Sequence, residues 1–145
     1  MQTGTRPIKG TKKMIANMTP VLQSGTYVFC SAIHNDDARG AMSLAKGMFI
    51  EDEGISLILP KAEADRLGFP YEDSMKLITL MVVSSLTGVG LTAAVAKALT
   101  KAQIPANVVA ATQHDHVFIP SKQADEAMEV LRALQASAQA DLAKT

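Results

Sequence analysis

The chain has 145 residues, of which 48% are hydrophobic and 19% charged. This composition supports a folded core and excludes a disordered chain. Lys and Arg number 14 together, as do Asp and Glu, so no net positive charge attracts a phosphate backbone and no nucleic-acid partner is expected. The single cysteine excludes an internal disulfide. No signal peptide is expected, because no apolar region follows the N-terminus, and the longest apolar run, over 77–83, is too short to span a membrane. We therefore expect a cytoplasmic protein with no membrane partner.

The first half predicts a helix, three strands and a second helix, preceded by a loose polar arm over residues 1–10. Residues 34–40 are predicted to be a polar loop, in an insert that covers 34–47. The predicted elements are a helix over 12–18 stopped by Pro20, a strand over 27–33, a hairpin of strands 48–50 and 55–59, and a helix over 61–67 closed by Gly68 and Pro70.

The second half predicts the order β-α-β-β-α. Residues 76–83 are predicted to be a strand that is apolar on both faces, followed by a loop over 84–90. The following elements are a helix over 91–102 with one apolar stripe, strands over 107–112 and 117–119, and a last helix capped by Ser121 that buries Ala124, Ala127, Met128, Leu131 and Leu134. The link between the two strands is too short for a helical crossover, so they are predicted to be antiparallel. Residues 136–145 are predicted to fray.

Two segments of the chain resemble each other. Pro60 aligns with Pro120 and Ala64 with Ala124, each after an apolar run and at the start of a helical pattern. Residues 17–29 also parallel 97–109 at a larger offset, which predicts about 20 extra residues in the first half. A duplicated small domain is indicated, and a seam between two such domains is a favoured place for a small ligand.

This order of elements predicts an α+β fold, with helices on one face of antiparallel sheets. The chain resembles the small bacterial tandem ACT-domain proteins in three features. These are the proline at the start of two predicted helices, the segment from Ser84 to Val95 and the segment from His114 to Pro120. The resemblance implies two ferredoxin-like βαββαβ subdomains in a pseudo-symmetric tandem pair. We expect these domains over 11–72 and 73–135, with a tail over 136–145. The resemblance also implies a regulatory protein that binds a small effector, most suitably an amino acid, without catalysing a reaction.

The loop between the predicted strand and the helix at residue 91 is the candidate ligand site. Free backbone N–H groups at a helix start favour an anion such as a carboxylate, and glycines allow close approach. The residues assigned to the site are Ser84, Ser85, Thr87, Gly88, Val89 and Gly90, with His114 and Asp115 from the neighbouring hairpin. Asp115 is the expected acceptor for an amine. The alternative is that the loop only makes a tight turn and caps the helix.

The loop also fits the dinucleotide pattern G-x-G-x-x-A at Gly88, Gly90 and Ala93. However, the strand over 107–112 turns straight back into a hairpin instead of continuing a parallel sheet, so NAD is not expected. No other cofactor is indicated.

The triplet His114-Asp115-His116 is the other candidate for chemistry. Two His residues at i and i+2 rarely chelate one ion unless the turn is distorted, and no second Cys or His group lies at ligand spacing, so no metal site is expected. Cys30 is predicted to be a core residue rather than a nucleophile, and no catalytic residue is assigned.

Two other functions stay open: a dimerisation or scaffold protein without a ligand, and a small enzyme that uses His114 or His116 of the His114-Asp115-His116 hairpin as a general base. Exposed strand edges predict a homodimer.

Overall fold

The computed structural model describes residues 10–82 and 89–144. The contacts divide the chain into two units: one is Ser24–Lys76, and the other comprises the residues on both sides of it. We describe each unit separately. The division differs from the predicted domains, 11–72 and 73–135, in where it puts the residues before Ser24.

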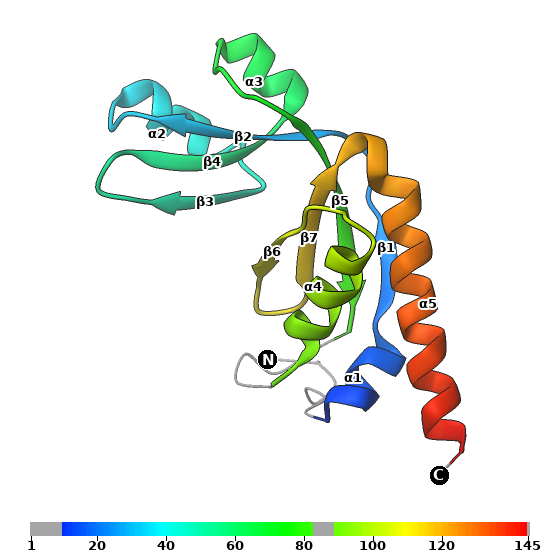
Figure 1. Cartoon of the computed structure of the whole chain (residues 1–145). Helices are drawn as coiled ribbons and strands as arrows, with labels where there is room; N and C mark the ends of the chain where they lie inside the picture. The colour runs from blue at the N-terminus through cyan, green and yellow to red at the C-terminus, as the bar shows by residue number, and fades with distance from the viewer. Residues whose placement is uncertain (1–9, 83–88, 145) are drawn as a thin grey trace. The chain divides into compact units, whose positions relative to one another are not determined.

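The unit Ser24–Lys76 is a βαββαβ sandwich. Its elements are β2 (Tyr27–Ala32), α2 (Asp36–Met42), β3 (Gly47–Ile50), β4 (Ile55–Pro60), α3 (Lys61–Leu67) and the first residues of β5 (Ser74–Met81). The strands lie in the order β3-β4-β2-β5, and β2 is antiparallel to both of its neighbours. The core lies between this sheet and the two helices (Figure 1), and it includes Val28, Cys30, Ala38 and Ala64.

Helix α2 corrects the prediction of a polar insert over 34–47. The Asn35 side chain caps the helix by accepting a hydrogen bond from the backbone N–H of Ala38 at 2.9 Å. Ala38 and Ala41 are fully buried. The sequence carried these signals, because an Asn cap, two acidic residues in the first turn and apolar residues at i and i+3 are typical of a helix start. The helix has only seven residues. Because so short a segment shows little periodicity, its polar composition led to the prediction of a loop.

The second unit repeats the same order of elements, except that its last strand comes from the N-terminal part of the chain. Its elements are β5, α4 (Leu91–Lys101), β6 (Asn107–Ala110), β7 (Asp115–Pro120), the 3₁₀ turn η1 (Ser121–Gln123), α5 (Ala124–Ala143), and, from the N-terminal side, α1 (Thr11–Asn17) and β1 (Thr19–Leu22). The strand order is β6-β7-β5, and β1 pairs antiparallel with β5. β1 therefore stands where a ferredoxin-like unit has its fourth strand.

Strand β1 was not predicted, because Pro20 was interpreted only as the end of a helix. A proline is tolerated in an edge strand, where its missing N–H need not donate to a neighbour. Strand β5 serves both units: Ser74 and Met75 pair with β2, whereas Ile78–Met81 pair with β1.

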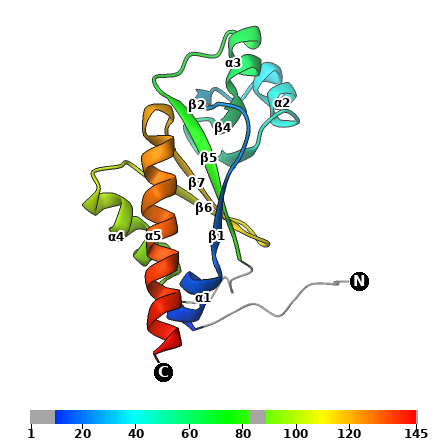
Figure 2. The ribbon, with the colours of Figure 1, turned by 90° about the vertical axis from the view of Figure 1, so that its right-hand side faces the viewer.

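Helix α5 extends well beyond its predicted end. Ala124, Ala127, Met128 and Leu131 are buried as predicted, and Leu134 packs against the same core. The predicted fraying is wrong over 136–143: α5 continues to Ala143, lies alongside α1 in both views (Figures 1 and 2) and buries Ala138. The Gln135 and Gln139 side chains donate hydrogen bonds to the Ala16 carbonyl at 3.1 and 3.0 Å. Ser121 starts the 3₁₀ turn, and α5 itself begins at Ala124.

The internal repeat is real where β4 and β7 enter their helices. Both strands have the same burial pattern, in which the second and the last residue are half-buried and the other four are buried. Pro60 has φ −54° and ψ 134°, and Pro120 has φ −53° and ψ 135°. The second predicted match, 17–29 with 97–109, pairs elements that are not equivalent, because β2 opens one unit while β6 is the second strand of the other. The prediction of two ferredoxin-like α+β subdomains is confirmed.

Candidate functional site

The predicted ligand loop lies only partly within the described residues. Ser84, Ser85, Thr87 and Gly88 fall outside them, while Val89 and Gly90 are described. Gly90 occupies the position before α4 with φ 104° and ψ −20°, a backbone conformation that favours glycine. The cap residue Gly90 has no side chain that could accept a hydrogen bond from the first backbone N–H groups of α4.

The close approach at Gly90 is made by the protein itself. A Cβ atom on Gly90 would lie 2.7 Å from Cγ2 and 2.8 Å from Oγ1 of Thr11. The Thr11 hydroxyl donates a hydrogen bond to the Val89 carbonyl at 2.5 Å. Gly90 is therefore needed where α1 meets the start of α4, and this explains one glycine of the loop without a ligand. Thr11 was missed because no local sequence signal links positions so far apart.

The hairpin between β6 and β7 holds the other predicted site residues. His114 is half-buried, and its Nδ1 atom lies 3.5 Å from the carbonyl oxygen of Val82, the last described residue before the predicted loop. Asp115 is buried, with 7% of its surface exposed. It alternates in phase with Val117 and Ile119, which belong to the core under the helices. The hairpin thus lies beside the end of β5, and Asp115 is on the side of the sheet that α4 and α5 cover.

His116 takes part in a hydrogen-bonded chain that sequence reasoning missed. The Gln23 amide donates to the Thr79 hydroxyl at 3.1 Å, and the same hydroxyl lies 3.1 Å from Nδ1 of His116. Since the hydroxyl accepts from Gln23, its own proton can point to Nδ1, which leaves the proton of a neutral imidazole on Nε2. Thr79 is only 3% exposed. This chain links β5 and β7 to the residue that follows β1, a structural role for His116 that needs no reaction.

Two cavities are lined by residues of the unit Ser24–Lys76. The first, of about 430 Å³, is lined by Phe29, Tyr71 and Met75 together with Pro70, Glu72 and Asp73. The Tyr71 hydroxyl donates to Asp65 at 2.6 Å. That hydrogen bond is the largest cause that lowers the pKa of Asp65, and a second hydrogen bond, donated by Lys61 at 3.0 Å, lowers it further. The ionised carboxylate of Asp65 therefore accepts both hydrogen bonds.

The second cavity, of about 590 Å³, lies between α2 and the C-terminal end of α3. Arg66 of α3 and the acidic first turn of α2 both contribute to its lining. Sequence reasoning did not locate this cavity, because it assigned no helix to the α2 segment.

The predicted role of Cys30 agrees with the structure. Cys30 is a free thiol on β2 and is 4% exposed within the core. Burial raises the pKa of the thiol, which lowers the thiolate fraction near neutral pH and makes the group a poor nucleophile. Over residues 10–82 and 89–144, no three His, Cys, Asp or Glu side chains are close enough to hold a metal ion. In the same ranges, no helix has both the length and the apolar character to span a membrane.

Comparisons with known proteins agree with this architecture. Family models described as "ACT domain" match residues 7–76 and 74–133. A solved structure of a protein of unknown function from Vibrio cholerae, described as a possible transport protein, is 35% identical. It has a TM-score of 0.76, and the match covers 86% of this chain and 94% of that one. The regulatory subunit of aspartate kinase from Thermus flavus shares the fold at 9% identity and a TM-score of 0.60, with 80% of this chain and 96% of that one covered. No curated protein matches the chain.

Proposed function

Because the chain belongs to the family of tandem ACT-domain proteins, we propose that it is a regulatory protein that binds a small-molecule effector, specifically an amino acid, and catalyses no reaction. The two ACT-domain matches, which together extend from residue 7 to residue 133, carry this proposal. The shared fold of an aspartate kinase regulatory subunit supports it. We place the protein in the cytoplasm, where the reduced Cys30 fits the redox conditions.

We assign the effector site to the loop of Ser84, Ser85, Thr87, Gly88, Val89 and Gly90, together with His114 and Asp115. Two observations support this assignment. Gly90 provides no side-chain cap for α4, and the first N–H groups and the dipole of a helix favour a carboxylate. Asp115, on the α4 side of the sheet, provides a negative charge for the amine of the same ligand.

A thermal-shift series with the twenty amino acids tests the proposal. Binding at a concentration of one hundred times Kd adds about 2.7 kcal/mol to the free energy of unfolding. For a chain of this size that corresponds to a rise in Tm of about 8 °C. The methyl ester of the active amino acid should give a smaller shift, because it lacks the carboxylate. If no amino acid changes Tm, the proposal of an amino-acid effector fails.

Asp115→Asn tests the assigned site more directly. Losing a charge-assisted hydrogen bond weakens binding by about ten- to a hundred-fold. Asp125→Asn, at an exposed position on α5, is the matched control and should bind as the wild type does. Urea unfolding of both variants separates a loss of affinity from a loss of fold. Unchanged affinity in a folded Asp115→Asn protein would move the site elsewhere.

The second candidate function is a dimerisation or scaffold protein without a ligand. The observation that favours it is a set of large apolar side chains exposed in the unit Ser24–Lys76: Ile33 is 71% exposed, Phe49 70% and Ile50 61%. Phe49 and Ile50 lie on the edge strand β3, and exposed apolar edges invite pairing with another chain. A homodimer is proposed under either function. Light scattering at micromolar concentration tests it, and a mass of 15.4 kDa, that of the monomer, would contradict it.

A further inference from the structure

The cleft between α2 and α3 has features of a ligand site in a part of the molecule that the proposed effector loop does not include. Its volume of about 590 Å³ is within the range of small-molecule sites, roughly 300–1,000 Å³. Ile33, Leu44 and Leu67 line it and are 71%, 37% and 40% exposed. These apolar side chains would lose contact with water if a ligand filled the cleft.

Gly40 is the first specific feature of the cleft. It lies within α2, yet nothing is found within 4 Å of the place that a Cβ atom would occupy. Its φ is not positive, so the backbone does not require glycine there. A helix-interior glycine is less favourable than alanine, and the packing of this unit offers no compensation. A small residue at this point does leave the wall of the cleft open.

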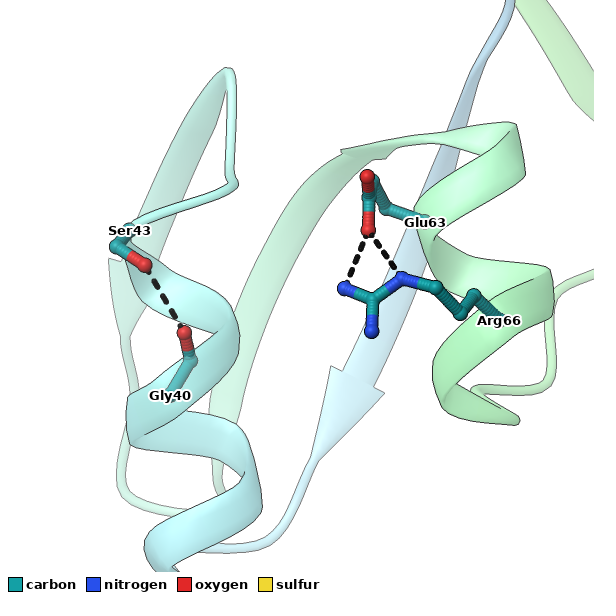
Figure 3. A network of polar contacts seen from close by, with 4 residues as sticks. All are labelled: Gly40, Ser43, Glu63 and Arg66. Carbon is teal, nitrogen blue, oxygen red and sulfur yellow. Dashed lines mark hydrogen bonds and ion pairs between the residues drawn. The ribbon is translucent and has the colours of Figure 1, made fainter.

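Arg66 supplies a positive charge on the opposite wall. Figure 3 shows its guanidinium reaching from α3 into the space that faces α2. Its Nε and Nη2 atoms both donate to the same oxygen of Glu63, at 2.9 and 2.6 Å. A guanidinium has five N–H donors, so three remain for another acceptor. A planar fork of this kind suits a carboxylate.

Negative charge lies on the α2 side of the same cleft. Asp36 and Asp37 both line it. Asp36 pairs with Arg39 at 4.0 Å, whereas no ion pair within residues 10–82 and 89–144 involves Asp37. A ligand that carried only a carboxylate would meet these aspartates, and a ligand that carried only an ammonium would meet Arg66. A molecule with both charges matches both walls.

We propose that the α2–α3 cleft is a second binding site, which takes a small zwitterion with a short aliphatic body. Arg66 receives the carboxylate, Asp37 receives the ammonium group, and the apolar body lies over Gly40 against Leu44. The ligand class is that of the proposed function, so the two ideas share it, but the site is separate and is built wholly within Ser24–Lys76. A ligand that lies over residue 40 explains why glycine stands there, although neither the backbone conformation nor the packing of α2 requires it.

The test follows backbone amide signals of the full chain by NMR during titration with L-valine. Isovalerate, which lacks the ammonium, and isobutylamine, which lacks the carboxylate, are the matched probes. We expect L-valine to shift amide signals of α2 and of the end of α3, and each single-charge probe to bind at least about tenfold more weakly, as expected for one lost charged contact. Equal binding of all three probes would overturn the zwitterion assignment.

Variants locate the site. Gly40→Leu fills the cleft and should abolish the L-valine shifts, while Ala62→Leu, which adds the same side chain at an exposed position of α3, should preserve them. Arg66→Gln should weaken binding about tenfold or more, whereas Glu63→Gln should strengthen it because the guanidinium is released. Undiminished binding to a folded Gly40→Leu protein would overturn the proposal.

The residues whose amide signals shift distinguish binding in the α2–α3 cleft from binding at the proposed effector loop. Shifts confined to α2 and α3 would support the cleft and leave the loop without support. Shifts around Gly90 and Asp115 alone would support the loop and refute the cleft. No shifts with L-valine up to about 10 mM, well above a millimolar Kd, would refute the cleft, while the loop would still be tested by the thermal-shift series.

Discussion

The contact between Gly90 and Thr11 gives a quantitative prediction about stability. Gly90→Ala places a side chain in a backbone conformation that costs about 1–3 kcal/mol for residues other than glycine. The new Cβ would also lie 2.7 and 2.8 Å from two Thr11 atoms, so Thr11 must move and lose its hydrogen bond to the Val89 carbonyl, worth about 0.5–1.5 kcal/mol. Together these contributions lower the free energy of unfolding of Gly90→Ala by about 1.5–4.5 kcal/mol.

Gly68→Ala is the matched control for this prediction. Gly68 also has a positive φ, 75°, but nothing lies within 4 Å of its Cβ position. Its replacement should cost only the backbone strain, about 1–2 kcal/mol. Urea unfolding measures both variants, and the double variant Gly90→Ala with Thr11→Ala should lose less than the sum of the single losses because they share one contact. A Gly90→Ala protein within about 0.5 kcal/mol of the wild type, the usual range of neutral surface substitutions, would refute the reasoning.

Three further predictions follow from the fold and from the core. The isolated fragment 76–145 should show no cooperative unfolding transition in urea, because it lacks β1 and α1. A cooperative transition would contradict the role given to β1. Deleting residues 136–145 should lower stability by about 1–3 kcal/mol, since it removes buried Ala138 and the hydrogen bond of Gln139; equal urea midpoints would show that this end of α5 does not stabilise the fold. The raised pKa of Cys30 predicts a loss of stability as pH rises past the usual thiol pKa of about 8.5, because the unfolded thiol ionises first. Cys30→Ala should abolish that part of the pH dependence, and an identical pH profile in the variant would count against it.

Local signals in the sequence were sufficient for the elements that carry the repeat. The apolar runs in β4 and β7 and the proline that ends each strand predicted the helix entries, while the turn over 51–54 and the short link before residue 117 predicted the hairpins. The resemblance to tandem ACT-domain proteins, based on these proline positions and on the segments from Ser84 to Val95 and from His114 to Pro120, was correct for the fold. Helix α2 was also within reach, because the Asn35 cap and the alanines after it are local features. It was missed because a short helix with a polar first turn has the composition of a loop.

Contacts between segments that are distant along the chain could not be predicted from the sequence. The pairing of β1 with β5 assigns the N-terminal segment to the unit that contains α5, whereas the sequence order placed it in the first domain. The use of β5 by both units, the contact of Thr11 with Gly90 and the α2–α3 cleft arise in the same way. The physical reason is that helix caps and strand alternation depend on neighbouring residues, so a sequence displays them. Strand order and the side chains that meet across a fold depend on how the whole chain buries its apolar faces, and no local pattern encodes that choice.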